Sequence, residues 1–133
     1  MKVSAEEIQP GLVLHLDPDK LVEHGATFTC AEDRRVRGGH FFICISVNSD
    51  GVEWLPVYSK AGVDREALGK AGRTGHSKWT EAECHYHGEQ LWIAGHAAIV
   101  AAAESGRDMS RPGARNMLAT EFLPSITLSR SQR

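Results

Sequence analysis

Long apolar runs are missing from this 133-residue chain. No stretch approaches the roughly 18 consecutive apolar residues that a membrane-spanning helix needs, so we expect no membrane association. No apolar run follows Lys2 either, and we therefore expect no signal peptide. Cysteine is scarce: only Cys30, Cys44 and Cys84 are present, whereas a secreted disulfide scaffold usually has more cysteines, in even number. Together these absences predict a cytoplasmic protein with reduced thiols.

An excess of basic residues is also missing. The chain has 15 Lys and Arg residues against 17 Asp and Glu residues, and its formal net charge is −2. A protein that holds long nucleic acid through many phosphates usually has a basic balance. The sequence contains no Walker-type loop, no Gly-x-Gly-x-x-Gly, no HExxH and no Gly-x-Ser-x-Gly. It therefore gives no support to a nucleotide-cofactor enzyme, a zinc protease or a common serine hydrolase, and we expect no cofactor.

The sequence does contain a series of strand patterns separated by turns. The strongest is at residues 40–47, which are aromatic and β-branched, and a turn leads from it to a hairpin partner at residues 52–59. Pro56 removes one ladder hydrogen bond from that partner, which favours an edge strand or a bulge. Residues 60–78 are polar and Gly-rich, so we expect a long loop there, with at most a helical turn at 64–68. Further strands are predicted at residues 12–16 (with both faces covered), 27–30, 79–87 and 90–93.

Helical patterns follow the strands. Residues 96–104 are Ala-rich and have high helix propensity, and Gly106 follows where a terminating glycine belongs. Ser110 and Pro112 indicate the start of a second helix that runs through Leu118. Strands followed by helices suggest a small barrel or curled sheet with helices at one end. We predict a single domain, residues 1–133, with the barrel at 8–93, a helix at 96–105 and a C-terminal extension at 107–133.

Several stretches, in this order, carry a resemblance to a known family. Residues 8–11, which read Ile-Gln-Pro-Gly, lead into the first predicted strand, and the basic residue Arg37 comes shortly before the most apolar strand. The next strand ends on the hydroxyl residue Ser59, and Gln90 opens the last strand before the helix. Over about residues 8–104 the chain thus resembles the PemK/MazF-like growth-inhibitor toxins.

The resemblance implies a mainly β (α+β) fold, a small antiparallel SH3-like barrel with one or two C-terminal helices. It also implies a homodimer, an antitoxin-like protein partner and metal-independent endoribonuclease activity on single-stranded RNA. The family's catalytic arginine falls best on Arg37 and its threonine or serine on Ser59. The family usually has Arg-Pro before the apolar strand, whereas a Gly-Gly pair follows Arg37 here.

The residues themselves are compatible with that chemistry. RNA cleavage without metal needs a proton acceptor near the 2′-hydroxyl and a cation beside the charged transition state. The imidazole of His40, or that of His76, would be the acid or base, because imidazole exchanges protons near neutral pH. The alternative is structural: Arg37 is then a solvated loop residue and Ser59 merely ends a strand.

Basic and aromatic residues around the long loop predict an RNA-binding surface. His76 and Lys78 precede Trp79, and an aromatic ring with nearby cations can stack bases and hold phosphates. Lys60, at the start of the loop, is expected to contact RNA as well. The alternative for Trp79 is that it begins a strand and packs inward.

The stretch ECHYHGEQLW is a second candidate site. On a strand, alternate side chains share a face, so Glu83, His85 and His87 lie opposite Cys84 and Tyr86. His85 and His87 could therefore ligate one metal, with Glu83 or His76 as the third ligand. A structural zinc site would need four ligands, and no suitable cysteine or histidine spacing supplies them. We therefore favour a solvated strand face opposite a buried Cys84 and Tyr86, and we expect no metal.

The cysteines are not expected to act as nucleophiles. Cys44 lies inside the most apolar strand, and a buried thiol is normally inert. Cys84 has histidine neighbours in the sequence, but neighbouring residues on a strand point to opposite faces.

A second function, from a different class, stays open on the sequence. The chain would then be a non-catalytic β-barrel that binds a protein partner or a small ligand. Residues 60–78 would be its contact surface.

Overall fold

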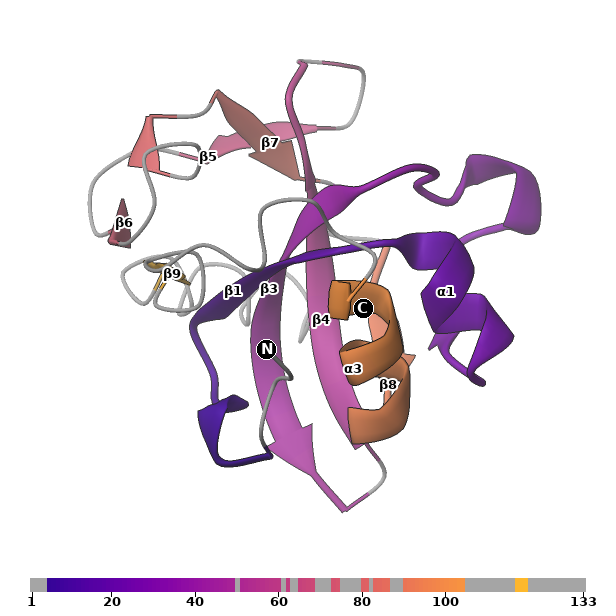
Figure 1. The fold of residues 1–133 in the computed structure, drawn as a ribbon. Helices are drawn as coiled ribbons and strands as arrows, with labels where there is room; N and C mark the ends of the chain where they lie inside the picture. Colours follow the sequence, from indigo (N-terminus) through magenta and orange to yellow (C-terminus); the bar gives the residue numbers. More distant parts are fainter. Residues whose placement is uncertain are drawn as a thin grey trace.

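A computed structural model of the chain describes residues 5–49, 51–60, 62, 65–68, 73–74, 80–81, 83–86, 90–104 and 117–119. These residues form a mainly antiparallel β structure with helices beside it (Figure 1), which confirms the predicted mainly β class. The strands are β1 (Leu12–Leu16), β2 (Thr27–Phe28), β3 (His40–Asn48), β4 (Gly51–Tyr58), β5 (Glu66–Leu68), β6 (Arg73–Thr74), β7 (Cys84–Tyr86), β8 (Trp92–Ala94) and β9 (Met117–Ala119). The helices are α1 (Pro18–Glu23) and α3 (His96–Glu104), with 3-10 turns η1 (Ala5–Glu7) and η2 (Glu32–Arg34).

The main path of strands runs in the order β2-β8-β4-β3-β1-β9-β6. Every pairing along this path is antiparallel. The strands β5 and β7 pair with each other, and β7 also pairs with the end of β4. They lie at the upper end of the long strands in Figure 1. Among the described residues, the two end strands of the path do not pair with each other, so the sheet is open there.

The strand β4 changes its neighbour at Pro56. Residues 52–54 pair with β8 and residues 57–58 pair with β7, while β3 runs along the other side. The predicted edge position is therefore wrong, since β4 lies inside the sheet. Proline has no N–H to donate. Pro56 lies between the residues that pair with β8 and those that pair with β7, where the ladder on that side of β4 is interrupted. The bulge lies in β3 instead, between Cys44 and Ser46.

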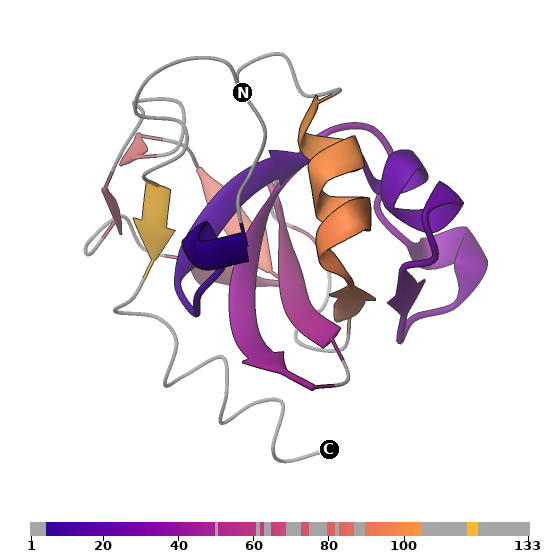
Figure 2. The same cartoon turned by 60° about the horizontal axis from the view of Figure 1, so that its bottom comes forward.

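The core lies around β1, β3, β4 and α3. Leu12, Val13, Leu14 and Leu16 of β1 are all buried, which confirms that both faces of this strand are covered. The helix α3 begins at the predicted residue, His96, and lies against the sheet beside α1 (Figure 2). Its small side chains let it lie close to the strands. The buried residues of this helix have the spacing of one helix face and are Ala98, Ile99, Ala102 and Ala103.

The helix α1 was not predicted, although the sequence carries a signal for it. Asp17 is its N-cap and its side chain accepts a hydrogen bond from the backbone N–H of Asp19 at 2.9 Å. Pro18 occupies the first helical position, where a missing N–H costs nothing, and Leu21 is buried. None of the helices in the described ranges has both the length and the apolar character needed to cross a membrane.

Two helical predictions are wrong because tertiary pairing overrides local propensity. The second helix was expected to run through Leu118, but Met117–Ala119 form β9, which lies between β1 and β6. The helical turn expected at residues 64–68 is replaced by β5, which pairs with β7. Residues 60–78 are therefore not a structureless loop, since they contain β5 and β6. The start of the expected second helix, residues 110–116, lies outside the described residues.

No disulfide joins the three cysteines, all of which lie among the described residues. Cys44 is fully buried in β3, as predicted. Burial, with a smaller effect of the Glu53 carboxylate, raises the pKa of the Cys44 thiol from 9.0 to about 12. In the unfolded chain the same thiol ionises close to its ordinary value. The stabilisation that follows is fully present below pH 9.0 and is lost as the pH rises toward about 12.

We therefore expect the free energy of unfolding of the wild type to fall more steeply between pH 9 and 12 than that of Cys44→Ala. Denaturant unfolding at several pH values measures this. Cys30→Ala is the matched control, because Cys30 is only partly buried and its substitution should change the slope less. Parallel curves for the wild type and Cys44→Ala would contradict the expectation.

Candidate functional site

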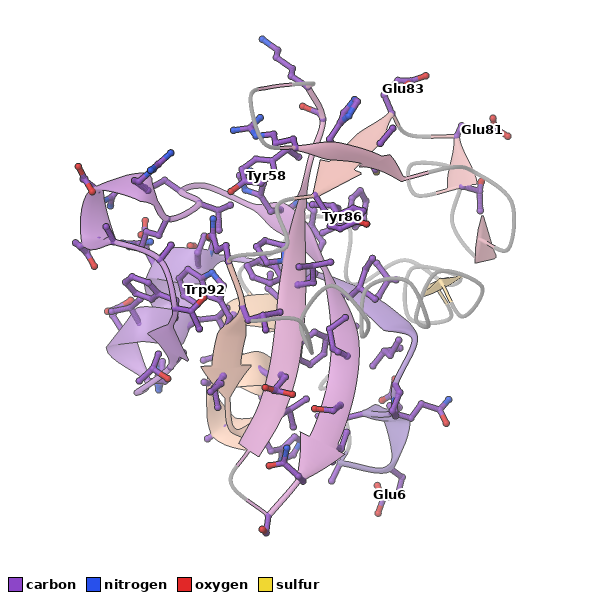
Figure 3. The ribbon with its side chains drawn as sticks, turned by 180° about the vertical axis from the view of Figure 1, so that it is seen from behind. Glu6, Tyr58, Glu81, Glu83, Tyr86 and Trp92 are labelled. Atoms are coloured by element: carbon purple, nitrogen blue, oxygen red, sulfur yellow. The ribbon has the colours of Figure 1, made fainter. Side chains whose placement is uncertain are left out.

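A pocket of about 300 Å³ lies where the end of β1, the start of β3, the end of β4 and the start of β7 meet. The antiparallel register explains this meeting: His15 lies opposite Phe41, and Tyr58 lies opposite His85. Figure 3 shows Tyr58 near the β5–β7 pair and Glu83 on the outer side of β7. The residues that line the pocket are His15, Gly39, His40, Phe41, Val57, Tyr58, Ser59, Glu83 and Cys84.

Two of the three predicted catalytic residues line this pocket. His40 begins β3 and is half-buried, and Ser59 follows β4 and is exposed. The hairpin of β3 and β4 brings them together, because the start of one strand lies beside the end of the other.

The third predicted catalytic residue, Arg37, is not among the residues that line the pocket. It is exposed, and its guanidinium Nη2 donates to the backbone oxygen of Glu32 at 3.1 Å and lies 3.7 Å from the Glu32 carboxylate. Arg37 is nevertheless separated from the pocket-lining Gly39 by a single residue.

Of the predicted RNA-binding residues, Lys60 is the one that the structure describes. It is exposed beside Ser59, and its backbone oxygen accepts a hydrogen bond from Arg65 Nη1 at 3.1 Å. The other three, His76, Lys78 and Trp79, lie outside the described residues.

The tautomer of His40 follows from its hydrogen bond. Nδ1 of His40 lies 2.9 Å from the backbone oxygen of Gly38. A carbonyl oxygen can only accept, so Nδ1 carries the hydrogen, and Nε2 of the neutral ring keeps a lone pair. The ring also meets Tyr58 edge to face, with a centroid distance of 5.8 Å. His40 is thus held in a form that can take a proton through Nε2.

A second imidazole, that of His15, enters the pocket from β1. Its ring packs edge to face against Phe41, with a centroid distance of 5.2 Å. It also lies against the backbone of Gly39, where a Cβ atom would overlap the Cε1 atom of His15. Glycine at position 39 therefore permits the observed place of this ring.

Behind the pocket lies a buried carboxamide, that of Gln90. Its Oε1 accepts from the backbone N–H of Val36 at 3.1 Å and from Nε1 of Trp92 at 3.0 Å. Its Nε2 donates to the hydroxyl oxygen of Tyr58 at 2.6 Å. Among the described residues, Gln90 is the buried residue with a polar side chain, and three hydrogen bonds satisfy it.

Tyr58 also carries a cation on its ring. The Cζ atom of Arg65 lies 3.7 Å from the Tyr58 ring centroid, which is cation–π geometry. Burial raises the pKa of Tyr58, although Arg65 and the hydrogen bond from Gln90 act in the opposite direction. The phenol therefore keeps its proton at neutral pH.

For the stretch ECHYHGEQLW, the predicted burial of Cys84 and Tyr86 is confirmed. Cys84 and Tyr86 are buried, while Glu83 is exposed and His85 is half-buried on the other face. His87 lies outside the described residues. Within the part of the chain that the structure describes, no group of three His, Cys, Asp or Glu side chains could hold a metal ion.

Sequence reasoning missed His15, which lines the pocket, and Arg65, which lies over the pocket-lining Tyr58. His15 had a weak signal, as the single polar residue in a strand that is otherwise apolar. Arg65 had no signal, because its position over Tyr58 depends on the pairing of β5 with β7.

No protein-family model, curated protein or solved structure matches this chain. The function is therefore inferred from the chemistry of the pocket.

Replacing Gln90 by Leu should destabilise the fold by about 2–4 kcal/mol, because buried donors on Val36 and Trp92 would lose their acceptor. Denaturant unfolding measures the loss. Gln9→Leu, at an exposed position, is the control and should change stability little. A Gln90→Leu variant as stable as the wild type would show that the network contributes nothing net.

Replacing Gly39 by Ala should move the His15 ring, because the new methyl group would clash with its Cε1 atom. The imidazole resonances of His15 and their pH titration, followed by NMR, should change. Gly95→Ala is the control, since nothing lies within 4 Å of a Cβ atom there. Unchanged His15 resonances in Gly39→Ala would contradict the observed packing.

Proposed function

We propose that this chain is a PemK/MazF-like, metal-independent endoribonuclease that acts on single-stranded RNA. The observation that carries the proposal is the pocket in which His40 and Ser59, both predicted as catalytic from the sequence, meet beside a second imidazole, that of His15. Imidazole and hydroxyl groups suit acid–base cleavage of RNA, because the 2′-hydroxyl of the substrate is itself the nucleophile.

In the proposed reaction, Nε2 of His40 accepts the proton of the 2′-hydroxyl, and the 2′-oxygen attacks the neighbouring phosphorus. The bond from phosphorus to the 5′-oxygen breaks, and that oxygen takes a proton from the His15 imidazolium. The products are a 2′,3′-cyclic phosphate and a 5′-hydroxyl. The hydroxyl of Ser59 donates to a non-bridging oxygen of the phosphorane-like transition state.

Arg37 keeps a role in the proposal, as a cation that an RNA phosphate recruits. Its ion pair with Glu32 is exposed, and exposed pairs contribute only about 0–1 kcal/mol. A phosphate bound at the mouth of the pocket can therefore compete with Glu32 for the guanidinium. Lys60, beside Ser59, adds a second exposed cation. His76, Lys78 and Trp79 stay predicted RNA contacts.

We also propose that the chain forms an SH3-like barrel, is a homodimer, binds an antitoxin-like partner and is located in the cytoplasm. The feature that supports the barrel is β4, which belongs to the main sheet through β8 and to the β5–β7 pair through β7. A strand that bridges two sheets in this way is how small barrels turn their corners.

The pocket also supports a second candidate function. Its volume of about 300 Å³ and its aromatic lining fit a small ligand. The chain would then be a non-catalytic β-barrel binding module for that ligand or for a protein partner.

A cleavage assay separates the two functions. Purified wild type is incubated with mixed-sequence single-stranded RNA at low salt, with and without chelator. We expect chelator-resistant cleavage. His40→Gln should lower the rate about 100-fold or more, the range for loss of a general base. Ser59→Ala should lower it about 10- to 100-fold, the range for loss of a hydrogen bond to a charged group.

His24→Gln and Ser49→Ala are the matched controls, since both residues are exposed and neither lines the pocket. They should cleave like the wild type. Absence of cleavage by folded wild-type protein would overturn the ribonuclease proposal and favour the binding module.

A further inference from the structure

The hydrogen bonds of Gln90 fix which way its carboxamide faces. Its two neighbours on one side, the backbone N–H of Val36 and Nε1 of Trp92, can only donate. The atom between them must therefore be the amide oxygen, and the amide nitrogen faces Tyr58. The Tyr58 oxygen consequently accepts a hydrogen bond from Gln90, and its own hydrogen has to point elsewhere.

That hydrogen has no acceptor among the described residues. Tyr58 is half-buried and lines the pocket. Its raised pKa means that the hydroxyl stays a donor at neutral pH. The pocket therefore holds a hydrogen-bond donor whose orientation is set from behind by a buried amide.

Arg65 lies over the same ring and is held in place by its surroundings. Its backbone N–H donates to the backbone oxygen of Gly62 at 3.2 Å, and its Nη1 donates to the backbone oxygen of Lys60 at 3.1 Å. A Cβ atom at position 62 would lie 3.1 Å from Cδ of Arg65, so glycine lets the side chain pass closely. The guanidinium is thus positioned with most of its N–H groups still able to donate.

The charge of Arg65 also differs from that of its neighbours. Arg35 pairs with Asp19 and Glu32, and Arg37 lies 3.7 Å from Glu32. Within the described part of the chain, no carboxylate lies at ion-pair distance from Arg65. A positioned cation beside an oriented phenol donor is a pair of groups suited to an oxyanion.

We infer that the Tyr58 hydroxyl, which lines the pocket, and the Arg65 guanidinium, which lies over the Tyr58 ring beside the pocket lining, together bind a non-bridging oxygen pair of an RNA backbone phosphate at the edge of this pocket. The inference rests on the proposed function for the identity of the anion, and it adds two residues that the sequence did not indicate. Because the guanidinium lies over the ring that carries the hydroxyl, both donors can reach one tetrahedral phosphate. Arg65 is then the cation at the edge of the pocket, next to Tyr58, and Arg37 and Lys60 contact neighbouring phosphates.

The test uses binding without cleavage. A fluorescent 2′-O-methyl oligoribonucleotide, which lacks the nucleophile, is titrated with the full chain, and inorganic phosphate is used as competitor. Tyr58→Phe keeps the ring under Arg65 and removes only the donor. It should raise Kd about 10-fold, the range for a hydrogen bond to a charged group. Arg65→Met should raise Kd at least as much and lower the slope of log K against log salt by about one.

Arg34→Met is the matched control, because Arg34 is an exposed arginine on η2 that does not line the pocket. It should leave Kd within about twofold of the wild type, as expected for a distant surface charge. Unfolding curves for all variants show whether Tyr58→Phe, which also frees the Gln90 amide, stays folded; if it does not, Arg65→Met decides alone.

The outcomes distinguish this inference from the ribonuclease proposal. Binding that is lost in both variants while the wild type does not cleave RNA would leave the phosphate site standing without the ribonuclease. Cleavage by the wild type with unchanged Kd and unchanged salt slope in both variants would overturn the phosphate site alone. No binding of either probe by the wild type would overturn it as well.

Discussion

The buried carboxamide of Gln90 is the interaction on which the arrangement of the pocket depends. It joins the segment before β3, the end of β4 and the start of β8 through Val36, Tyr58 and Trp92. If one of these partners is lost, a buried polar group is left without a hydrogen bond and its desolvation is no longer compensated. The contacts therefore stabilise the fold only as a set. Gln90 bonds both to the loop that leads to His40 and to the strand that ends at Tyr58. This one side chain therefore fixes the position of the loop relative to the strand.

The arginines show why net charge says little about this protein. Arg35 is almost fully buried between the carboxylates of Asp19 and Glu32, and its guanidinium lies 5.9 Å from the Trp92 ring centroid, so its charge serves the packing of α1 and η2. Arg65 instead holds its charge over the ring of Tyr58, a residue that lines the pocket. A net charge of −2 for the chain therefore does not exclude a local positive site.

The sequence predicted those strands and helices that depend mainly on residues close together in the chain. β1, the β3–β4 hairpin and α3 follow from apolar runs, a turn and Ala-rich propensity, and their observed bounds agree closely with the predicted ones. β9 could not be predicted, since its strand form depends on β1, more than a hundred residues earlier. The meeting of His40 with Ser59 follows from a hairpin and was predictable. The Gln90–Val36 contact spans 54 residues, and the Arg65–Tyr58 contact depends on β5.

The change of neighbour at Pro56 divides β4 into two halves that are paired to different extents with the strands beside them. The half beside β8 is part of a continuous ladder over the core, whereas the half beside β7 is joined by residue pairs at Val57 and Tyr58 alone among the described residues. Free energies of local opening scale with the contacts that are broken. The β5–β7 pair is thus held to the main sheet by this short ladder and by the burial of Cys84 and Tyr86, so its attachment depends on side-chain packing more than on backbone pairing.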